Sequence, residues 1–202
     1  MDLANYKKVW KNQPEEKNKI SALEIYKMTQ SKSNSIVKWI FIIGLLEFVI
    51  LNSLVFFIDL NKAYQEYEKI GLKNFIIITE VLYYIVAVIF LIMFYLNYRN
   101  IDVNDSSRLL FGKILKTRKT VKLYVFFNLT YIFIIMIVVS ISFIRMNSEK
   151  IPKDKIGLVI GLFALVGLFL LGTIWAFYQL LYGFLLKKLK RNYKELSKLK
   201  MK

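Results

Sequence analysis

Four long apolar blocks constrain this chain more than any other feature of its sequence. They cover residues 36–58, 75–96, 123–144 and 156–186. At a rise of 1.5 Å per residue, a helix of about 20 residues crosses a hydrocarbon layer about 30 Å thick. The sequence therefore predicts an all-α fold, an integral membrane four-helix transmembrane bundle with short amphipathic helices on its cytoplasmic side.

The basic residues indicate how the predicted spans are oriented. The segment up to Lys38 holds eight Lys, the loop 97–122 holds seven Lys or Arg, and the tail 187–202 holds eight, whereas the two remaining connections together hold seven. Because Lys and Arg concentrate in cytoplasmic loops, we expect a bacterial inner-membrane protein with both termini in the cytoplasm. The Lys and Arg residues that give the chain its net charge of +16 flank the apolar blocks, where anionic lipid headgroups attract them. Direct nucleic-acid binding is therefore not expected.

The composition argues against several classes of chemistry. The chain has no cysteine and no histidine, which removes thiolate and imidazole metal ligands and His-based acid–base catalysis. No pair of a nucleophile and a base is visible in the sequence. We therefore expect no metal, no cofactor and no enzymatic activity.

Residues 1–35 are predicted to be a cytoplasmic helical segment ahead of the first span. Leu3, Tyr6 and Trp10 form an apolar stripe at helical spacing, and Pro14 should end this short helix. The segment is less basic than the other cytoplasmic ones, and it is typical of a module that binds a partner protein.

A second helix is predicted to follow within the same segment. Ser21 and Glu24 have the spacing of a capping box, and the apolar side of the helix includes Ile25 and Met28. The polar run 31–35 is either a hinge or a continuation of this helix towards the membrane.

Two other cytoplasmic segments also carry apolar stripes at helical spacing. In the basic segment 108–122 the stripe is Leu110, Ile114, Thr117 and Val121, and in the tail it is Leu189, Tyr193 and Leu196. Asp105 or Ser106 should cap the first of these helices. The pattern leaves open whether the stripes contact the lipid surface or protein.

Polar side chains interrupt the predicted spans at four positions, Glu47, Asn52, Glu80 and Asn128. Glu47 lies about 12 Å past Trp39 along the helix, where a carboxylate is costly unless it is protonated, paired or turned towards other helices. It is either an ion or proton site or, as we favour, a polar contact that holds helices together, with Asn128 as its partner. Glu80 is predicted closer to the outer surface, not level with Glu47.

Small residues lie largely on one face of the fourth span. They are Gly157, Gly161, Ala164 and Gly172. Small side chains allow helix backbones to approach closely, so this face should pack within the bundle or, as the alternative, between protomers of a homo-oligomer.

Several motifs resemble those of a family of uncharacterised four-span bacterial membrane proteins. The motifs are YKKVWKNQ at 6–13, LEIYKM at 23–28, SIVKWIF at 35–41, ILKTRKTVKLY at 114–124 and LLYGFLLKKLKRNYKEL at 180–196. Members often carry the label of carotenoid-cleaving oxygenases. Those enzymes hold iron with four histidines, which this chain does not have.

The layout of the chain also resembles that of membrane-bound anti-sigma factors, in which short N-terminal helices hold a sigma factor at the membrane. The resemblance implies a protein that tethers or sequesters a cytoplasmic partner through Leu3, Tyr6, Trp10, Ile25 and Met28. The zinc-binding His/Cys motif of some such factors and a sizeable extracytoplasmic domain are missing from this sequence. The alternatives are a subunit or scaffold of a membrane complex, or a small transporter that uses Glu47.

Overall fold

The computed structural model of the chain describes residues 22–101 and 105–200, and every regular element within these ranges is a helix. The elements in chain order are α2 (Ala22–Ser53), the 3₁₀-helix η1 (Leu54–Phe57), α3 (Leu60–Lys69), α4 (Lys73–Arg99), α5 (Ser107–Met146), the 3₁₀-helix η2 (Lys153–Lys155), α6 (Ile156–Tyr178), the π-helix η3 (Gln179–Gly183) and α7 (Phe184–Lys200). Among the described residues, four helices are long and apolar enough to cross a membrane: Glu24–Phe57, Lys73–Arg99, Arg108–Met146 and Lys153–Lys194.

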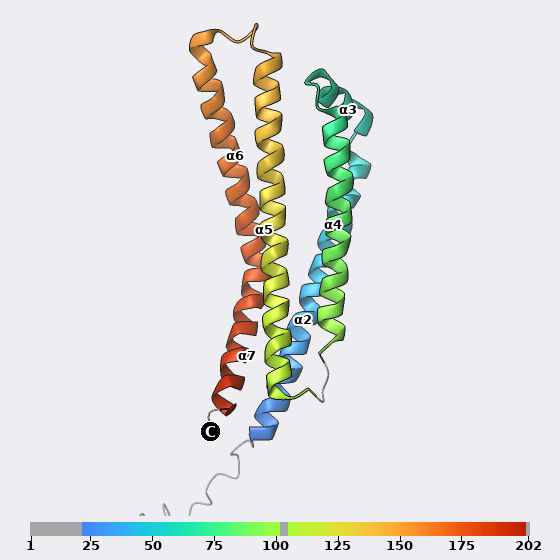
Figure 1. Ribbon diagram of the computed structural model, residues 1–202, viewed down its shortest axis with the longest axis vertical. Helices are drawn as coiled ribbons and strands as arrows, with labels where there is room; N and C mark the ends of the chain where they lie inside the picture. Colours follow the sequence, from blue (N-terminus) through green and yellow to red (C-terminus); the bar gives the residue numbers. More distant parts are fainter. Residues whose placement is uncertain (1–21, 102–104, 201–202) are drawn as a thin grey trace, which may run out of the picture.

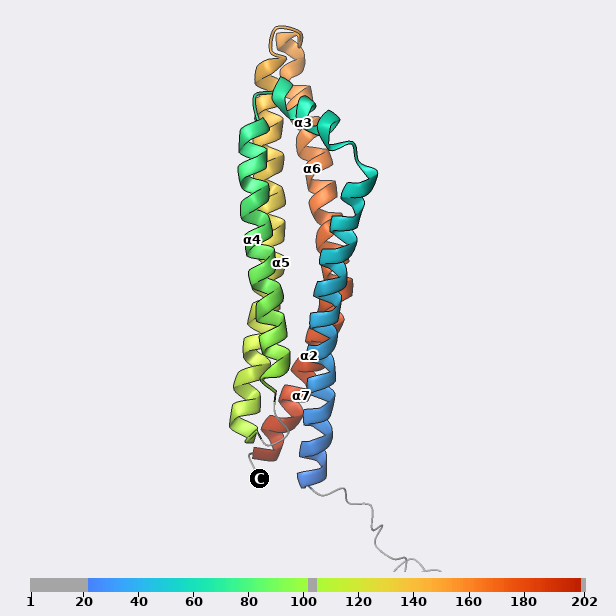
Figure 2. The same ribbon diagram turned by 90° about the vertical axis from the view of Figure 1, so that its right-hand side faces the viewer.

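The helices form an elongated bundle with two different ends (Figure 1). At one end lie the start of α2, the end of α4, the start of α5 and all of α7; we call it the basic end. The opposite end holds α3 and the turn between α5 and α6. Helix α7 contacts α2 and lies beside it in Figure 2, so the last helix closes the bundle at the basic end.

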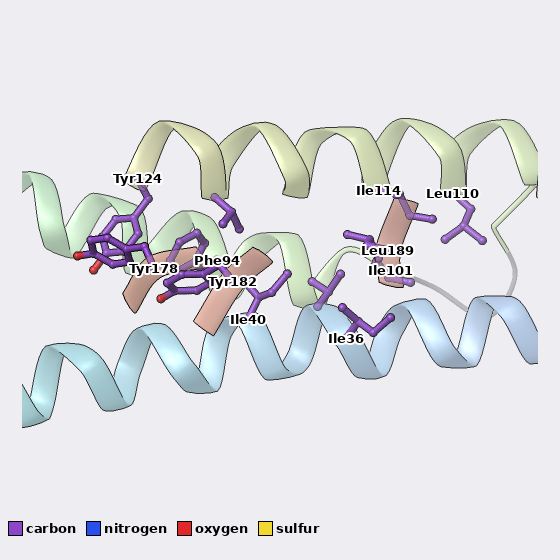
Figure 3. Close-up of a cluster of buried hydrophobic side chains, with 12 residues drawn as sticks. Ile36, Ile40, Phe94, Ile101, Leu110, Ile114, Tyr124, Tyr178, Tyr182 and Leu189 are labelled. Atoms are coloured by element: carbon purple, nitrogen blue, oxygen red, sulfur yellow. The ribbon is translucent and has the colours of Figure 1, made fainter. Parts of the chain in front are cut away.

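The buried core is concentrated towards the basic end. Its aliphatic side chains come from α2, α5 and α7 and from Ile101, two residues after the end of α4, and they face one another between the helices (Figure 3). The buried aliphatic residues are Ile36, Val37, Ile40, Ile101, Leu110, Ile114, Val121 and Leu189. This end of the bundle is therefore packed like the interior of a soluble helical protein.

The basic segment 108–122 is the first part of α5, not a separate helix. Helix α5 has 40 residues, and its part before Leu123 adds about 24 Å to a length sufficient to span a membrane. The apolar stripe of this segment is buried against other helices, while Lys116 and Lys119 are exposed. The question left open by the sequence is thus resolved, because the stripe contacts protein.

The start of α5 is fixed as the sequence predicted. The hydroxyl of Ser106 accepts a hydrogen bond from the backbone N–H of Leu109 at 3.4 Å, which makes Ser106 the N-cap. Asp105 forms a salt bridge with Lys113 at 2.5 Å, and its carbonyl accepts a hydrogen bond from Tyr26. These contacts join the beginnings of α2 and α5.

Helix α2 begins at Ala22, directly after the predicted cap Ser21, which lies outside the described residues. The helix continues without a break through 31–35, so the hinge alternative for this run is wrong. The reason is packing on α7, because Ser33 is buried and accepts a hydrogen bond from Asn192 Nδ2 at 3.2 Å. A hinge would expose this buried polar pair.

A short helix in the connection between α2 and α4 was not predicted from the sequence. Asp59 caps α3 by accepting a hydrogen bond from the backbone N–H of Lys62 at 3.1 Å. The chain then turns into α4 at Gly71, whose φ of 69° is readily available to glycine. The acidic and basic residues of this segment indicate a connection between two spans, but they do not predict that part of it is helical.

The packing of α5 at the basic end gives a first prediction. Replacing the fully buried Ile114 by Ala should lower the free energy of unfolding by about 2–5 kcal/mol, because the change leaves a cavity between helices. The neighbouring Leu115, which is 46% exposed, provides the matched control, and Leu115→Ala should change stability by no more than about 0.5 kcal/mol. Equilibrium unfolding in detergent measures both. Equal losses of stability in Ile114→Ala and Leu115→Ala would contradict the burial of this apolar stripe between helices.

Candidate functional site

Glu47 is the centre of a polar cluster inside the bundle. Its side chain is 8% exposed and lies on α2 within a stretch long and apolar enough to cross a membrane. The hydroxyl of Tyr178 donates to Oε1 at 2.7 Å, and the hydroxyl of Tyr182 donates to Oε2 at 2.9 Å. Both carboxyl oxygens are therefore satisfied by side chains from the end of the fourth apolar block.

The two tyrosines are positioned by a local change of helix type. Tyr178 ends α6, and Tyr182 lies in the π-helix η3. A π-helical turn contains an additional residue compared with an α-helical turn, and such turns are frequent at functional sites. The rings lie at 6.1 Å between centroids with an interplanar angle of 28°, so the hydroxyls reach the two oxygens of one carboxyl group together.

Gly44, one turn before Glu47, makes room for this arrangement. A Cβ atom at this position would lie 2.9 Å from Cδ2 of Phe94 and 3.6 Å from the hydroxyl of Tyr182. The first distance is shorter than van der Waals contact allows. The absence of a side chain at Gly44 thus lets α2 approach Phe94 and the tyrosines closely.

Tyr124 of α5 completes the aromatic surroundings of Glu47. Its ring lies edge-on to Tyr178 and Tyr182, with both centroid distances at 6.0 Å, and Figure 3 shows the three rings gathered with Phe94. Edge-on aromatic pairs of this kind add about 0.5–1.5 kcal/mol each beyond the area they bury. Packed rings also keep this part of the bundle closed around the carboxyl group.

Asn128 is not the partner of Glu47, so this sequence prediction is wrong. Asn128 Oδ1 accepts from the hydroxyl of Tyr83 at 3.0 Å, and its Nδ2 donates to the carbonyl of Tyr124 at 2.8 Å. Both tyrosines that donate to Glu47 come from the fourth apolar block, and the third block contributes the ring of Tyr124 to its surroundings, not Asn128. The prediction that Glu47 makes a polar contact between helices is confirmed with different partners.

Glu80 and Asn52 take no part in the hydrogen bonds to Glu47 within the described chain. Glu80 accepts a hydrogen bond from Tyr64 of α3 at 2.8 Å, and this bond raises the pKa of the Tyr64 hydroxyl. It lies 14 residues, or about 21 Å along α4, from Phe94 beside the cluster, so the two acids are not level, as predicted. Asn52 Nδ2 donates to its own helix, at the carbonyl of Phe48.

A small cavity lies beside the cluster between α2, α4 and α5. Its volume is about 90 Å³, and the polar side chains that line it are Asn52, Tyr83, Tyr84 and Tyr124. This size and polarity are sufficient for a few water molecules. The cavity therefore brings polar groups of the second and third apolar blocks close to Glu47 without adding a charge.

The chemistry available to the cluster is limited to hydrogen bonding and proton exchange. Among the described residues, no three acidic side chains gather in a way that could hold a metal ion. Glu47 accepts hydrogen bonds from the hydroxyls of Tyr178 and Tyr182, which carry no positive charge. The cluster can therefore join the first and fourth apolar blocks.

The predicted partner-binding residues are described in part. Leu3, Tyr6 and Trp10 lie outside the described residues. Met28 is 48% exposed and Ile25 is half-buried in the first turns of α2. Both therefore lie at the basic end of the bundle (Figure 1).

The small residues of α6 do not pack within the chain, which corrects the favoured sequence interpretation. A Cβ atom at Gly157, Gly161 or Gly172 would meet nothing within 4 Å, and Ala164 is exposed. Instead, Gly167 makes the close approach to α5, with the Met136 side chain against it. Many of the larger apolar side chains of α6 are exposed as well, so packing between protomers stays a prediction.

Sequence reasoning missed Tyr178, Tyr182 and Gly44. Aromatic residues near the ends of apolar blocks are typical anchors at the membrane surface, so the sequence does not mark these tyrosines as partners of a buried acid. The signal that could have found the tyrosines is their spacing of four, which places both hydroxyls on one helix face. The sequence offers no comparable signal for the π-helix that aligns them.

The hydrogen bonds of Glu47 give a second prediction. Tyr182→Phe should lower the free energy of unfolding by about 1.5–3 kcal/mol, because one oxygen of the buried carboxyl group loses its donor. In a Glu47→Leu background the same change should have little effect, because the acceptor is already gone. Unfolding in mixed micelles measures this double-mutant cycle, with the exposed Tyr95→Phe as control. If the effects of Tyr182→Phe and Glu47→Leu are additive, the hydrogen bond between the two side chains contributes nothing to the free energy of unfolding.

No curated protein and no solved structure matches the chain. A family model matches residues 23–201, which include nearly all of the described helices and the whole Glu47 cluster. On this match, the chain belongs to the family described as Domain of unknown function (DUF8845).

Proposed function

We propose that this is a non-enzymatic protein of the bacterial inner membrane that tethers a cytoplasmic partner through its N-terminal segment and the start of α2. The observation that carries the proposal is the apolar surface at the basic end formed by Met28, which is exposed, and Ile25, which is half-buried. Side chains of this kind in a region rich in Lys are typical of a helix that binds another protein.

Membrane insertion is supported by the surface of the bundle between its two ends. Large apolar side chains are exposed on all four long helices, for example Leu46, Leu82, Phe126 and Leu165. On α5 the exposed surface changes from charged to apolar between Lys122 and Leu123. Such a band is costly in water and favourable in lipid.

The basic end is proposed to face the cytoplasm. The predicted cytoplasmic segments, which hold most of the Lys and Arg, meet at this end. Because the bundle there is packed, it provides a rigid base for the start of α2 and for the segment that precedes it. The most specific form of the proposal has a sigma factor as the partner, and it rests on the resemblance to membrane-bound anti-sigma factors.

The tether predicts that the partner depends on residues ahead of the folded bundle. We expect a chain lacking residues 1–20 to insert and fold normally and to lose the partner, because the deletion ends before α2. The substitutions Trp10→Gln and Met28→Gln should together have the same effect. Pull-down from detergent-solubilised membranes, followed by mass spectrometry, measures partner capture.

Leu109→Gln is the matched control for these substitutions. Leu109 is an apolar residue at the basic end that is 58% exposed and lies on α5. The control should leave capture unchanged. Capture of the same partner by the truncated chain would contradict the tether, and recovery of a sigma factor by the full chain alone would identify the partner class.

A second candidate function, a small proton-coupled transporter, is favoured by one observation. Glu47 is a buried acid that accepts hydrogen bonds from two tyrosine hydroxyls, and it lies near a cavity large enough for water. Acids in such positions mark proton pathways in membrane proteins. In liposomes that contain a pH-sensitive dye, Glu47→Gln should abolish proton flux while Glu80→Gln should not. No flux through the unmodified protein would exclude this candidate.

A further inference from the structure

A groove on the outside of the bundle differs from the apolar surface around it. It has a volume of about 450 Å³ and runs between α5 and the continuous helix formed by α6, η3 and α7. Arg118 and Lys122 line it from α5, and Lys187 and Lys190 line it from α7. Four cations from two helices thus face one groove.

The groove changes in character along its length. The four cations gather where the surface of the bundle becomes charged. Away from them the lining residues include Phe126 and Leu129 on one side and Trp175 on the other. No acidic side chain is among the described residues that line the groove. One end therefore favours an anion and the other favours hydrocarbon.

Arg118 provides an independent indication of a ligand. Its Nε atom is buried, and it has no hydrogen-bond partner within the described part of the chain. A buried guanidinium nitrogen without an acceptor is costly. Arginine binds phosphate with paired N–H donors, so a phosphate oxygen in the groove would satisfy this atom.

We propose that the groove binds an anionic phospholipid, with its phosphate on Arg118, Lys122, Lys187 and Lys190 and an acyl chain along Phe126 and Trp175. Phe126 and Trp175 fit this assignment, because their exposed apolar rings would be covered by an acyl chain. A basic pocket between helices at the charged side of a membrane is a typical site for such headgroups. The proposal rests on the membrane insertion proposed above, but not on the tethered partner.

The groove also adjoins the Glu47 cluster. Tyr178 and Tyr182 line its inner wall, and their hydroxyls hold the carboxyl group of Glu47 on the other side. A bound acyl chain would therefore cover the two rings from outside. Among the described residues, the lipid site and the polar cluster share this wall.

The test is binding of phosphatidylglycerol and phosphatidylethanolamine to the full chain in detergent, followed by native mass spectrometry. The unmodified protein should prefer phosphatidylglycerol. The exposed pair Lys187→Gln with Lys190→Gln should weaken its binding about tenfold or more, because each cation near a headgroup contributes favourably. Arg118→Gln should likewise weaken it.

The matched control is Lys116→Gln with Lys119→Gln, which removes the same charge from exposed positions on α5 that do not line the groove. This pair should leave the affinity for phosphatidylglycerol within about twofold of the unmodified protein, because the charge lost lies outside the site. If both double variants lost affinity for phosphatidylglycerol equally, net charge alone would explain the effect. That result would overturn the site.

Two further outcomes bear on the proposal. Glycerol phosphate at millimolar concentration should not displace the lipid, and displacement would show that a free phosphate compound, not a lipid, is the ligand. Extraction of membranes with carbonate tests membrane insertion, on which the lipid site rests, separately from the lipid site itself. A chain released by carbonate contradicts membrane insertion and the lipid site together, whereas a retained chain without preference for phosphatidylglycerol overturns the lipid site alone.

Discussion

The pairing of one buried carboxyl group with two tyrosine hydroxyls is the interaction on which the arrangement of the bundle depends. Glu47 lies on the first long helix, and its donors lie at the end of the fourth, more than 130 residues away in the chain. In an apolar environment, an acid without hydrogen-bond donors carries a large desolvation cost. Arrangements of the bundle that separate these two helices are therefore disfavoured. The aliphatic core near the basic end adds stability but less specificity, because aliphatic contacts are not directional.

The bundle combines two kinds of helix packing along one axis. Towards the basic end, aliphatic side chains are accompanied by buried polar pairs, such as Asn97 with Thr120 at 3.1 Å and Asn192 with Ser33 at 3.2 Å. Beyond Glu47, the exposed surface becomes apolar and few side chains are fully buried. Lipid would cover that surface in a membrane, so the helices there need fewer contacts with one another.

The sequence predicted the four long helices well, because runs of about 20 apolar residues have few other solutions. It also predicted the cap at Ser106 and the different depths of Glu47 and Glu80. It could not decide what the stripe containing Ile114 contacts, because a helix shows the same periodicity on lipid and on protein. The partner of Glu47 was missed for a related reason, since depth along a helix says nothing about which helix lies opposite.

The π-helix at Gln179–Gly183 also determines how the last helix is turned. One additional residue in a helical turn rotates everything after it by about 100° about the axis, relative to an uninterrupted α-helix. With that rotation, α7 contacts α2, where Asn192 donates to Ser33, while the preceding helix α6 contacts α5. The π-helical turn thus allows one continuous helix to contact α5 with its first part and α2 with its last part.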